Sequence, residues 1–286
     1  MRTVRTVAEL RSALSDLRHT GGTVGLVITQ PTMGHLHDGH LSLVRRAREV
    51  CDATVVMLFL SSHQPDWARD PDGCVREVEQ DVAAAAAAGA DLLFAPPREE
   101  VYPAGFATEV RVGGLTEPLE GVQRGVSHFH GVTTVVTKAL NMTQPDVAFV
   151  GQKDAQQVLV VRKLVRDLDL PVRIEVCPTA REPDGVPISS HNLLLTPEDR
   201  RRAAAIWPAL EAARRAVDRG ERDPSALVRA THDVLSTRDI EPEYLELVSS
   251  DTLEPVHRLA GEALLAVALR FGDTRVIDNL VLREST

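Results

Sequence analysis

The stretch Val24–His40 reads VGLVITQPTMGHLHDGH and joins an apolar, β-branched run to a segment that carries two closely spaced histidines. This pattern predicts a strand that turns through Gly34 and opens a helix near Asp38. A helix start presents unpaired backbone N–H groups and the positive end of the helix dipole, so it suits a phosphate group. The stretch therefore predicts a strand–turn–helix unit with a phosphate site between the strand and the helix.

An H-x-G-H motif lies at the start of the expected helix. Residues three apart share one helix face, so His37 and His40 can point at the same phosphate. Gly39 between them has no side chain to block the close approach of a nucleotide. The motif is typical of enzymes that attack the α-phosphate of ATP. The preceding loop belongs to the same expected nucleotide site: Thr32, Met33 and Gly34.

Length and composition indicate an ordinary globular protein. The 286 residues suffice for one large or two smaller domains, and 43% of them are hydrophobic. A net charge of −9 and 3% aromatic residues argue against a nucleic-acid partner, because nucleic acids attract basic surfaces and stack on aromatic rings. No apolar run is long enough for a signal core or a membrane span, so we expect a cytoplasmic protein with no membrane partner. The three cysteines have neither disulfide nor metal-site spacing: Cys51, Cys74 and Cys177.

The first two-thirds of the chain alternates strand and helix patterns. A capping box at Thr6–Glu9 starts a first helix directly after the N-terminal residues. Further strands are expected at Val24–Thr29, Thr54–Leu60, Leu92–Ala95, Val147–Val150 and Val172–Val176. Helices are expected at Asp38–Val50, Val75–Ala88, Val132–Asn141 and Ala155–Leu168. Apolar strands flanked by helices predict an α/β fold with a buried parallel sheet, whose ligands bind beyond the carboxyl ends of the strands.

The sequence pattern changes after Pro178. A loop-rich stretch precedes a single charged helix over Pro197–Gly220 and a second helix near Pro224–Leu235. Three later runs predict a small antiparallel sheet: Tyr244–Val248, Ala263–Leu269 and Val276–Leu282. We therefore expect two domains, residues 1–178 and residues 179–286.

A second polar cluster begins where the Val147–Val150 strand ends. Gly151 leaves that strand, and Lys153 at a helix start would add a point charge to the anion site. Asp154 is the natural N-cap of the next helix, so a structural role competes evenly with a ligand role. Gln157 lies one turn further on and could face the same crevice.

Two other segments carry groups that could bind a substrate. Gln64 can both donate and accept hydrogen bonds, which suits a ligand with a hydroxyl or carbonyl group. Arg124 and His128 lie in what reads as a Gly-rich loop, where an unpaired Arg and His could hold a carboxylate or phosphate. An ordinary polar loop is the alternative for each segment.

Ser189, Ser190 and His191 follow one another near the expected domain junction. Two hydroxyls beside a titratable group could form a mobile phosphate clamp that closes over ATP. A Ser-rich hinge is the alternative. No Cys–His metal spacing, Ser–His–Asp arrangement or catalytic carboxylate pair stands out, so we expect no metal site built by the protein alone.

Together these clusters resemble the pantothenate synthetase family, ligases that join pantoate to β-alanine at the expense of ATP. Four segments match the family's motifs in order and spacing: Pro31–Leu43, Glu120–Val132, Phe149–Gln157 and Arg181–Asn192. The resemblance implies a Rossmann-like nucleotidyltransferase domain with a parallel sheet, a small α+β C-terminal lid domain and a homodimer. It also implies ATP as co-substrate, with Mg²⁺ assisting.

Residue roles also follow from the resemblance. His37 and His40 would steady the ATP phosphates as charge moves during attack. The α-phosphate would be held by Lys153, Ser189 and Ser190. The remaining assignments are Met33, Gln64 and Gln157 for the hydroxy acid, and Asp154 for the region of the ribose. The acid would attack the α-phosphorus and expel pyrophosphate, and the amine would then attack the acyl adenylate to give an amide and AMP.

The chain departs from the family pattern near the expected acid, amine and closing-loop positions. Asn and Pro of the family's F-V-N-P segment are Ser61 and Ser62 here, the acid of G-E-K-D is Gln152, and the Arg of S-S-R-N is His191. Exchanging Arg for His removes a permanent charge and a two-pronged donor. Either His191 or His63 compensates, or the substrate differs. Three alternatives therefore stay open: a paralogue with another small acid and amine, a transferase that keeps the nucleotide on its product, and a non-catalytic nucleotide-binding protein.

Overall fold

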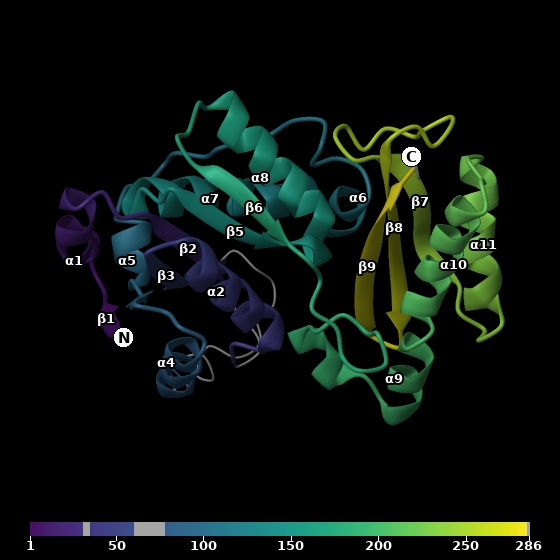
Figure 1. Cartoon of the computed structure of the whole chain (residues 1–286), viewed down its shortest axis with the longest axis horizontal. Helices are drawn as coiled ribbons and strands as arrows, with labels where there is room; N and C mark the ends of the chain where they lie inside the picture. Colours follow the sequence, from purple (N-terminus) through teal and green to yellow (C-terminus); the bar gives the residue numbers. More distant parts are fainter. Residues whose placement is uncertain (31–34, 60–77, 285–286) are drawn as a thin grey trace. The chain divides into compact units, whose positions relative to one another are not determined.

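A computed structural model of the chain describes residues 1–30, 35–59 and 78–284 (Figure 1). These residues divide into two compact units. The first comprises Met1–Gly151 with Val160–Pro178, and the second comprises Gln152–Leu159 with Thr179–Thr286. Among the described residues, no helix has the length and apolar character needed to cross a membrane.

The first unit is built on a six-stranded parallel sheet with the strand order β1-β4-β3-β2-β5-β6. The strands are β1 (Arg2–Val4), β2 (Val24–Thr29), β3 (Ala53–Leu58), β4 (Leu92–Phe94), β5 (Val147–Gly151) and β6 (Arg173–Cys177). The helices are α1 (Val7–His19), α2 (Asp38–Val50), α4 (Val78–Ala87), α5 (Arg98–Val101), α6 (Glu120–Arg124), α7 (Val126–Thr143) and α8 (Ala155–Asp167), whose first turn belongs to the second unit. The order reverses at β2, since β3 lies on one side of it and β5 on the other. Ligands of open α/β sheets bind at such a switch point.

Helix α2 is held against the sheet by its apolar face. Leu43, Val44 and Ala47 are buried in one cluster with Val27 of β2 and Val56 of β3. Full burial of an aliphatic side chain of this size contributes roughly 1.5–3 kcal/mol, so this contact fixes the helix axis. The start of α2 therefore lies just beyond the carboxyl end of β2, as the sequence predicts.

Several sequence-based expectations for this unit are confirmed. The parallel sheet is present, α2 has the expected bounds, and Thr6 caps α1 with Oγ1 accepting from the Glu9 amide at 3.2 Å. One expectation is wrong at the N-terminus, where Arg2–Val4 forms β1 beside β4 instead of leading straight into a helix. Only Val4 of this strand is buried, so the segment lacks the longer apolar run that marks the inner strands.

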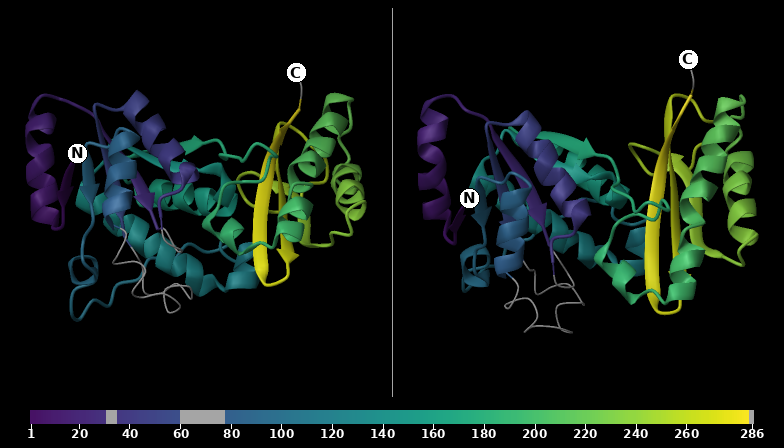
Figure 2. Two further views of the ribbon diagram at one scale, coloured as in Figure 1. Left: turned by 90° about the horizontal axis from the view of Figure 1, so that it is seen from below. Right: turned by 60° about the horizontal axis from the view of Figure 1, so that its bottom comes forward.

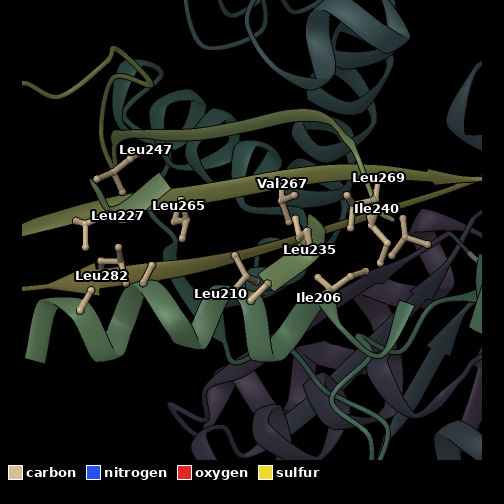
Figure 3. Close-up of a cluster of buried hydrophobic side chains, with 14 of the residues drawn as sticks. Ile206, Leu210, Leu227, Leu235, Ile240, Leu247, Leu265, Val267, Leu269 and Leu282 are labelled. Carbon is tan, nitrogen blue, oxygen red and sulfur yellow. The ribbon is translucent and has the colours of Figure 1, made fainter. Parts of the chain in front are cut away.

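The second unit packs helices against an antiparallel sheet in the order β7-β8-β9, which confirms the expected small sheet. The strands are β7 (Pro242–Ser249), β8 (Glu262–Phe271) and β9 (Thr274–Arg283). The helices are α9 (Pro197–Ala203), α10 (Ile206–Asp218) and α11 (Pro224–Ser236), with short 3-10 turns η2 (Gln152–Asp154) and η3 (Ser190–Leu194). Helices α10 and α11 lie side by side on one face of the sheet (Figure 2). Their shared core includes Leu210, Leu227 and Leu265 (Figure 3).

A single helix over Pro197–Gly220 is not observed. The chain forms α9 and α10 instead, with a break at Ala204–Ala205. Pro208 explains the break, because its ring would collide with the Ala204 carbonyl and its missing N–H would leave that carbonyl without a helical partner. A proline is tolerated only in the first turn, so the helix must restart just before it.

Candidate active site

The two histidines of the H-x-G-H motif lie face to face at the start of α2. His37 is the N-cap residue and His40 is the third residue of the helix, with ring centroids 3.9 Å apart and an interplanar angle of 17°. The backbone N–H of His37 donates to Nδ1 of His40 over 3.4 Å. Gly39 lies between them within the helix. The expected sharing of one face by the two imidazoles is thus present in the described structure.

A buried carboxylate holds the segment that leads into this motif. Asp81 of α4 is 3% exposed and accepts a hydrogen bond of 2.7 Å from the backbone N–H of Leu36. Its Oδ1 also lies 3.8 Å from Nδ1 of His35. Asp81 therefore fixes the chain immediately before His37. The sequence analysis did not identify Asp81. Its spacing of four and seven residues from Ala85 and Ala88 places it on the buried face of the helix, where an acid needs a partner.

The Gly-rich loop expected around Arg124 and His128 is wrong. Arg124 ends α6, and its Nε donates to the buried Glu120 carboxylate over 2.9 Å, so the guanidinium is already ion-paired. His128 lies in the first turn of α7, where its ring meets Phe129 edge-on at 5.4 Å between centroids. Glycine residues at both ends of this segment had suggested a loop, but the i,i+4 pair and the apolar run after Gly131 favour helices.

The second unit contains Lys153 and the polar residues next to it in the sequence. Lys153 and Asp154 lie in η2, directly before α8, with Nζ and Oδ1 3.7 Å apart. Gln157 lies on the first turn of α8 and is partly exposed. Gly151, the last residue of β5, precedes this turn. Lys153 thus stands at a helix start, as expected, with its charge partly balanced by the adjacent carboxylate.

Ser189 and His191 are joined by two contacts in the second unit. Ser189 Oγ accepts from the backbone N–H of His191 at 3.3 Å and also lies 3.3 Å from its Nδ1. Ser189 caps η3, which begins at Ser190. Ser189 and His191 are therefore in direct contact, and Ser190 lies between them in the sequence. The clamp itself stays a prediction.

The remaining expected site residues lie outside the described part of the chain. These are Thr32, Met33, Gly34 and Gln64, together with His63, Ser61 and Ser62 near Gln64. Within the described residues, no group of three or more His, Cys, Asp or Glu side chains could hold a metal ion. Of the described cysteines, Cys177 ends β6, and burial raises the pKa of its thiol to about 11, so it is protonated at neutral pH.

A parallel sheet with its switch point at β2, followed by an H-x-G-H helix start, defines a nucleotidyltransferase-like α/β protein. Comparisons with known proteins specify the family. A family profile described as Pantoate-beta-alanine ligase matches residues 2–281, and the chain belongs to this family. The Pantothenate synthetase of Cereibacter sphaeroides (strain ATCC 17029 / ATH 2.4.9) is 48% identical over 277 residues, covering 97% of this chain and 98% of the relative. The Pantothenate synthetase of Moorella thermoacetica is 45% identical over 287 residues, covering 99% of each chain.

Two solved structures agree with this assignment. Pantothenate synthetase from Thermus thermophilus matches with a TM-score of 0.86 and 43% identity, covering 98% of this chain and 99% of that one. Pantoate-beta-alanine ligase from Francisella tularensis, solved with "Beta-gamma ATP and Beta-alanine", matches with a TM-score of 0.76 and 27% identity over 100% of this chain and 99% of that one. The nucleotidyltransferase-like fold expected from the sequence is confirmed.

Proposed function

We propose that this chain is an ATP-dependent ligase that joins pantoate to β-alanine through an acyl adenylate. The stacked His37–His40 pair at the start of α2, in a chain that belongs to this ligase family, carries the proposal. The helix start offers backbone N–H groups to a phosphate, and the two imidazoles add donors that can follow charge as it moves to the leaving pyrophosphate.

The residues proposed for the nucleotide come from several segments of the chain. His37, His40 and Gly39 would act on the phosphates from α2, and Lys153 would supply a positive charge to the α-phosphate. The clamp group would supply further donors: Ser189, Ser190 and His191. The proposed nucleotide contacts also include Thr32, Met33, Gly34, Gly151 and Asp154.

For the acid substrate we propose Gln64, Gln157 and Met33, with His128 near the same ligand. A carboxylate of pantoate would attack the α-phosphorus, and the P–O bond to pyrophosphate would break. The amine of β-alanine would then attack the acyl carbon and release AMP. Positioning of reactants and stabilisation of developing charge account for catalysis of this kind without a protein nucleophile.

Mg²⁺ is proposed to enter with ATP. This ion commonly binds through substrate phosphates with only one or two carboxylates, so a preformed cluster of acids is unnecessary. Its contribution would be to neutralise charge on the leaving pyrophosphate. We also propose a homodimer, residues 1–178 as the ATP- and substrate-binding domain, residues 179–286 as a lid, and a cytoplasmic location.

The test is a reaction of the purified chain with ATP, Mg²⁺, pantoate and β-alanine, analysed for AMP, pyrophosphate and pantothenate. We expect AMP and pantothenate in equal amounts, and pantoate-dependent exchange of labelled pyrophosphate into ATP without β-alanine. A product that keeps the nucleotide would indicate a transferase instead. AMP formation only with another acid or amine would indicate a paralogue, for which the presence of His191 in place of the family's Arg is the motivating observation.

A further inference from the structure

Two adjacent polar residues interrupt the apolar pattern of β9. Asp278 and Asn279 lie within the strand Thr274–Arg283 and are 2% and 5% exposed. Buried polar groups cost free energy unless they are hydrogen-bonded. The hydrogen-bond partners of these two side chains therefore indicate why polar residues are buried here. Here the partners lie in the two segments of the second unit that carry Lys153 and the Ser189 group.

Asn279 uses its whole side-chain amide on η2. Its Nδ2 donates to the backbone carbonyls of Gln152 at 2.9 Å and Lys153 at 3.0 Å. Its Oδ1 accepts from Nε2 of Gln152 at 2.9 Å. One buried amide therefore makes two hydrogen bonds to the backbone of η2 and one to the Gln152 side chain, and so holds the residue whose ammonium is proposed to meet the α-phosphate.

Asp278 makes the corresponding connection to the chain before Ser189. Its carboxylate accepts two hydrogen bonds from the guanidinium of Arg181, at 2.6 and 3.0 Å, and one of 2.8 Å from the Asn279 backbone N–H. Burial raises the pKa of this carboxyl, whereas the facing guanidinium and the amide act to lower it. The guanidinium also stacks on Trp207, with 3.7 Å from Cζ to the ring centroid.

Arg181 belongs to a tight hairpin that leads into the clamp group. It bridges to Pro187 and donates to the Gly185 carbonyl at 3.0 Å. Asn192, just after His191, returns a hydrogen bond to the Pro187 carbonyl at 2.9 Å. Both ends of the segment that carries Ser189, Ser190 and His191 are thus tied to this hairpin. The hairpin is tied through Arg181 to β9.

We propose that Asn279 and Asp278 are positioning residues, which set Lys153 and the Ser189–His191 segment, respectively, for the ATP-dependent step. This inference rests on the proposed function, since it assigns a purpose to residues of that site. Asn279 holds the backbone of η2, and Asp278 holds Arg181, which begins the hairpin before Ser189. Hydrogen bonds of this kind fix the position of a segment without contacting its ligand. An apolar pair would serve the sheet core equally well, because satisfied buried polar groups add little net stability over well-packed apolar ones.

The experiment compares Asn279→Ala with Val276→Ala, a matched truncation on the same strand within the hydrophobic core. Both variants lose buried contacts, but only the first releases η2. We expect Asn279→Ala to lower kcat at least tenfold and to weaken ATP binding, with the KM for pantoate within about twofold of the wild type. Val276→Ala should keep kcat within about twofold. Equal losses in both variants would overturn the proposal.

A double-mutant cycle tests the route through Lys153. If Asn279 acts by holding Lys153, Asn279→Ala should change kcat by less than threefold in a Lys153→Ala background. Multiplication of the two single effects would contradict this. Should Asn279→Ala fail to fold, Arg181→Lys tests the other half, because it keeps the charge but loses the two-pronged contact and should weaken ATP binding at least fivefold. Unchanged ATP affinity there would overturn the role of Asp278.

ATP affinity separates this inference from the proposed function. A wild-type chain that makes no pantothenate would refute the function. The effects of Asn279→Ala, Val276→Ala and Arg181→Lys on the dissociation constant of ATP, measured by calorimetry, would still decide whether β9 positions the nucleotide-binding groups. Weaker binding in the first and third variants alone supports positioning, and unchanged binding in all three refutes it.

Discussion

His37 and His40 are coupled through one hydrogen bond as well as through ring stacking. The backbone N–H of His37 donates to Nδ1 of His40, and the rings lie 3.9 Å apart between centroids. A neutral imidazole that accepts at Nδ1 carries its proton on Nε2. The two nitrogens of His40 therefore differ: Nδ1 accepts a hydrogen bond at the helix start, and in the proposed function Nε2–H would be the donor to a phosphate.

Replacement of His40 by Gln or Asn separates these roles. An Asn amide can reproduce an acceptor near Nδ1, whereas a Gln amide can reproduce a donor near Nε2. If Nε2–H stabilises charge on the phosphates, His40→Gln should keep more activity than His40→Asn, and His40→Ala should lose about 10²–10³-fold in kcat. Steady-state AMP release measures this order. The reverse order, with Asn above Gln, would mean that His40 acts only as a helix cap.

His191 gives the second prediction, because it replaces an arginine that is usual in the family. Its ring nitrogen lies 3.3 Å from Ser189 Oγ at the clamp group. A histidine is charged only below about neutral pH, whereas arginine is always charged. We expect His191→Arg to raise kcat for adenylate formation and to flatten its dependence on pH between about 6 and 8. A fall in kcat at every pH would show that this chain has adapted to an uncharged group.

A second substitution at the same position serves as the control. His191→Gln keeps a neutral donor and acceptor but cannot take up a proton. If charge at this position matters, the activity of His191→Gln should fall further below that of the wild type as the pH is lowered, because an imidazole gains charge in acid and an amide does not. Pyrophosphate exchange at each pH provides the comparison.

The sequence predicted the parts of the fold that depend on local patterns. The bounds of α2 followed from its apolar face and the histidine motif, and the inner strands followed from runs such as Val24–Thr29 that are apolar on both faces. Strand β1 could not be recognised, because a three-residue edge strand is defined by its pairing with β4 and not by its own composition. The ion pair between Arg124 and Glu120 was missed for a related reason, since glycine residues nearby suggested a loop.

The positioning residues required the structure. Lys153 was visible as a cation at a helix start, but its link to Asn279 spans 126 residues of sequence and depends on the register of β9. Local patterns carry no information about such a contact. A weak signal existed in retrospect: an Asp-Asn pair within the apolar run Val276–Leu282 is costly unless something satisfies it.

The third prediction concerns acid stability and the pair Asp184–Arg200. Two hydrogen bonds from the Arg200 guanidinium, one of them 2.9 Å long, lower the pKa of the Asp184 carboxyl below its ordinary value. A carboxyl whose pKa is lower in the folded state than in the unfolded state stabilises the fold at pH values above the unfolded pKa, which is about 4. This stabilisation is lost as the pH falls through the folded-state pKa. Asp184→Asn should therefore lower Tm near pH 7 and should change Tm less at about pH 2.5.

The effect of that substitution should be small. The Asp184 side chain is 44% exposed, so solvent screening limits the contribution to about 1 kcal/mol or less. Arg200→Gln removes the same pair from the other side and should produce a similar loss near pH 7. Thermal unfolding of both variants at the two pH values is the measurement. A loss that is larger in acid than at neutral pH would contradict the assignment.

Gly121 provides the last prediction, because its backbone leaves no room for a side chain. A Cβ at this position would lie 2.0 Å from the backbone oxygen of Thr116, and backbone cannot swing away as a flexible side chain can. Gly121→Ala should therefore lower the free energy of unfolding by more than about 3 kcal/mol or prevent folding, as expected of severe overpacking.

Gly131 is the matched control, since it lies inside α7 with nothing within 4 Å of its added Cβ. Gly131→Ala should raise stability by up to about 1 kcal/mol through helix propensity. Denaturant unfolding measures the free energy of unfolding of the two variants. A Gly121→Ala variant as stable as the wild type would show that the backbone around Thr116 can move to accommodate a Cβ.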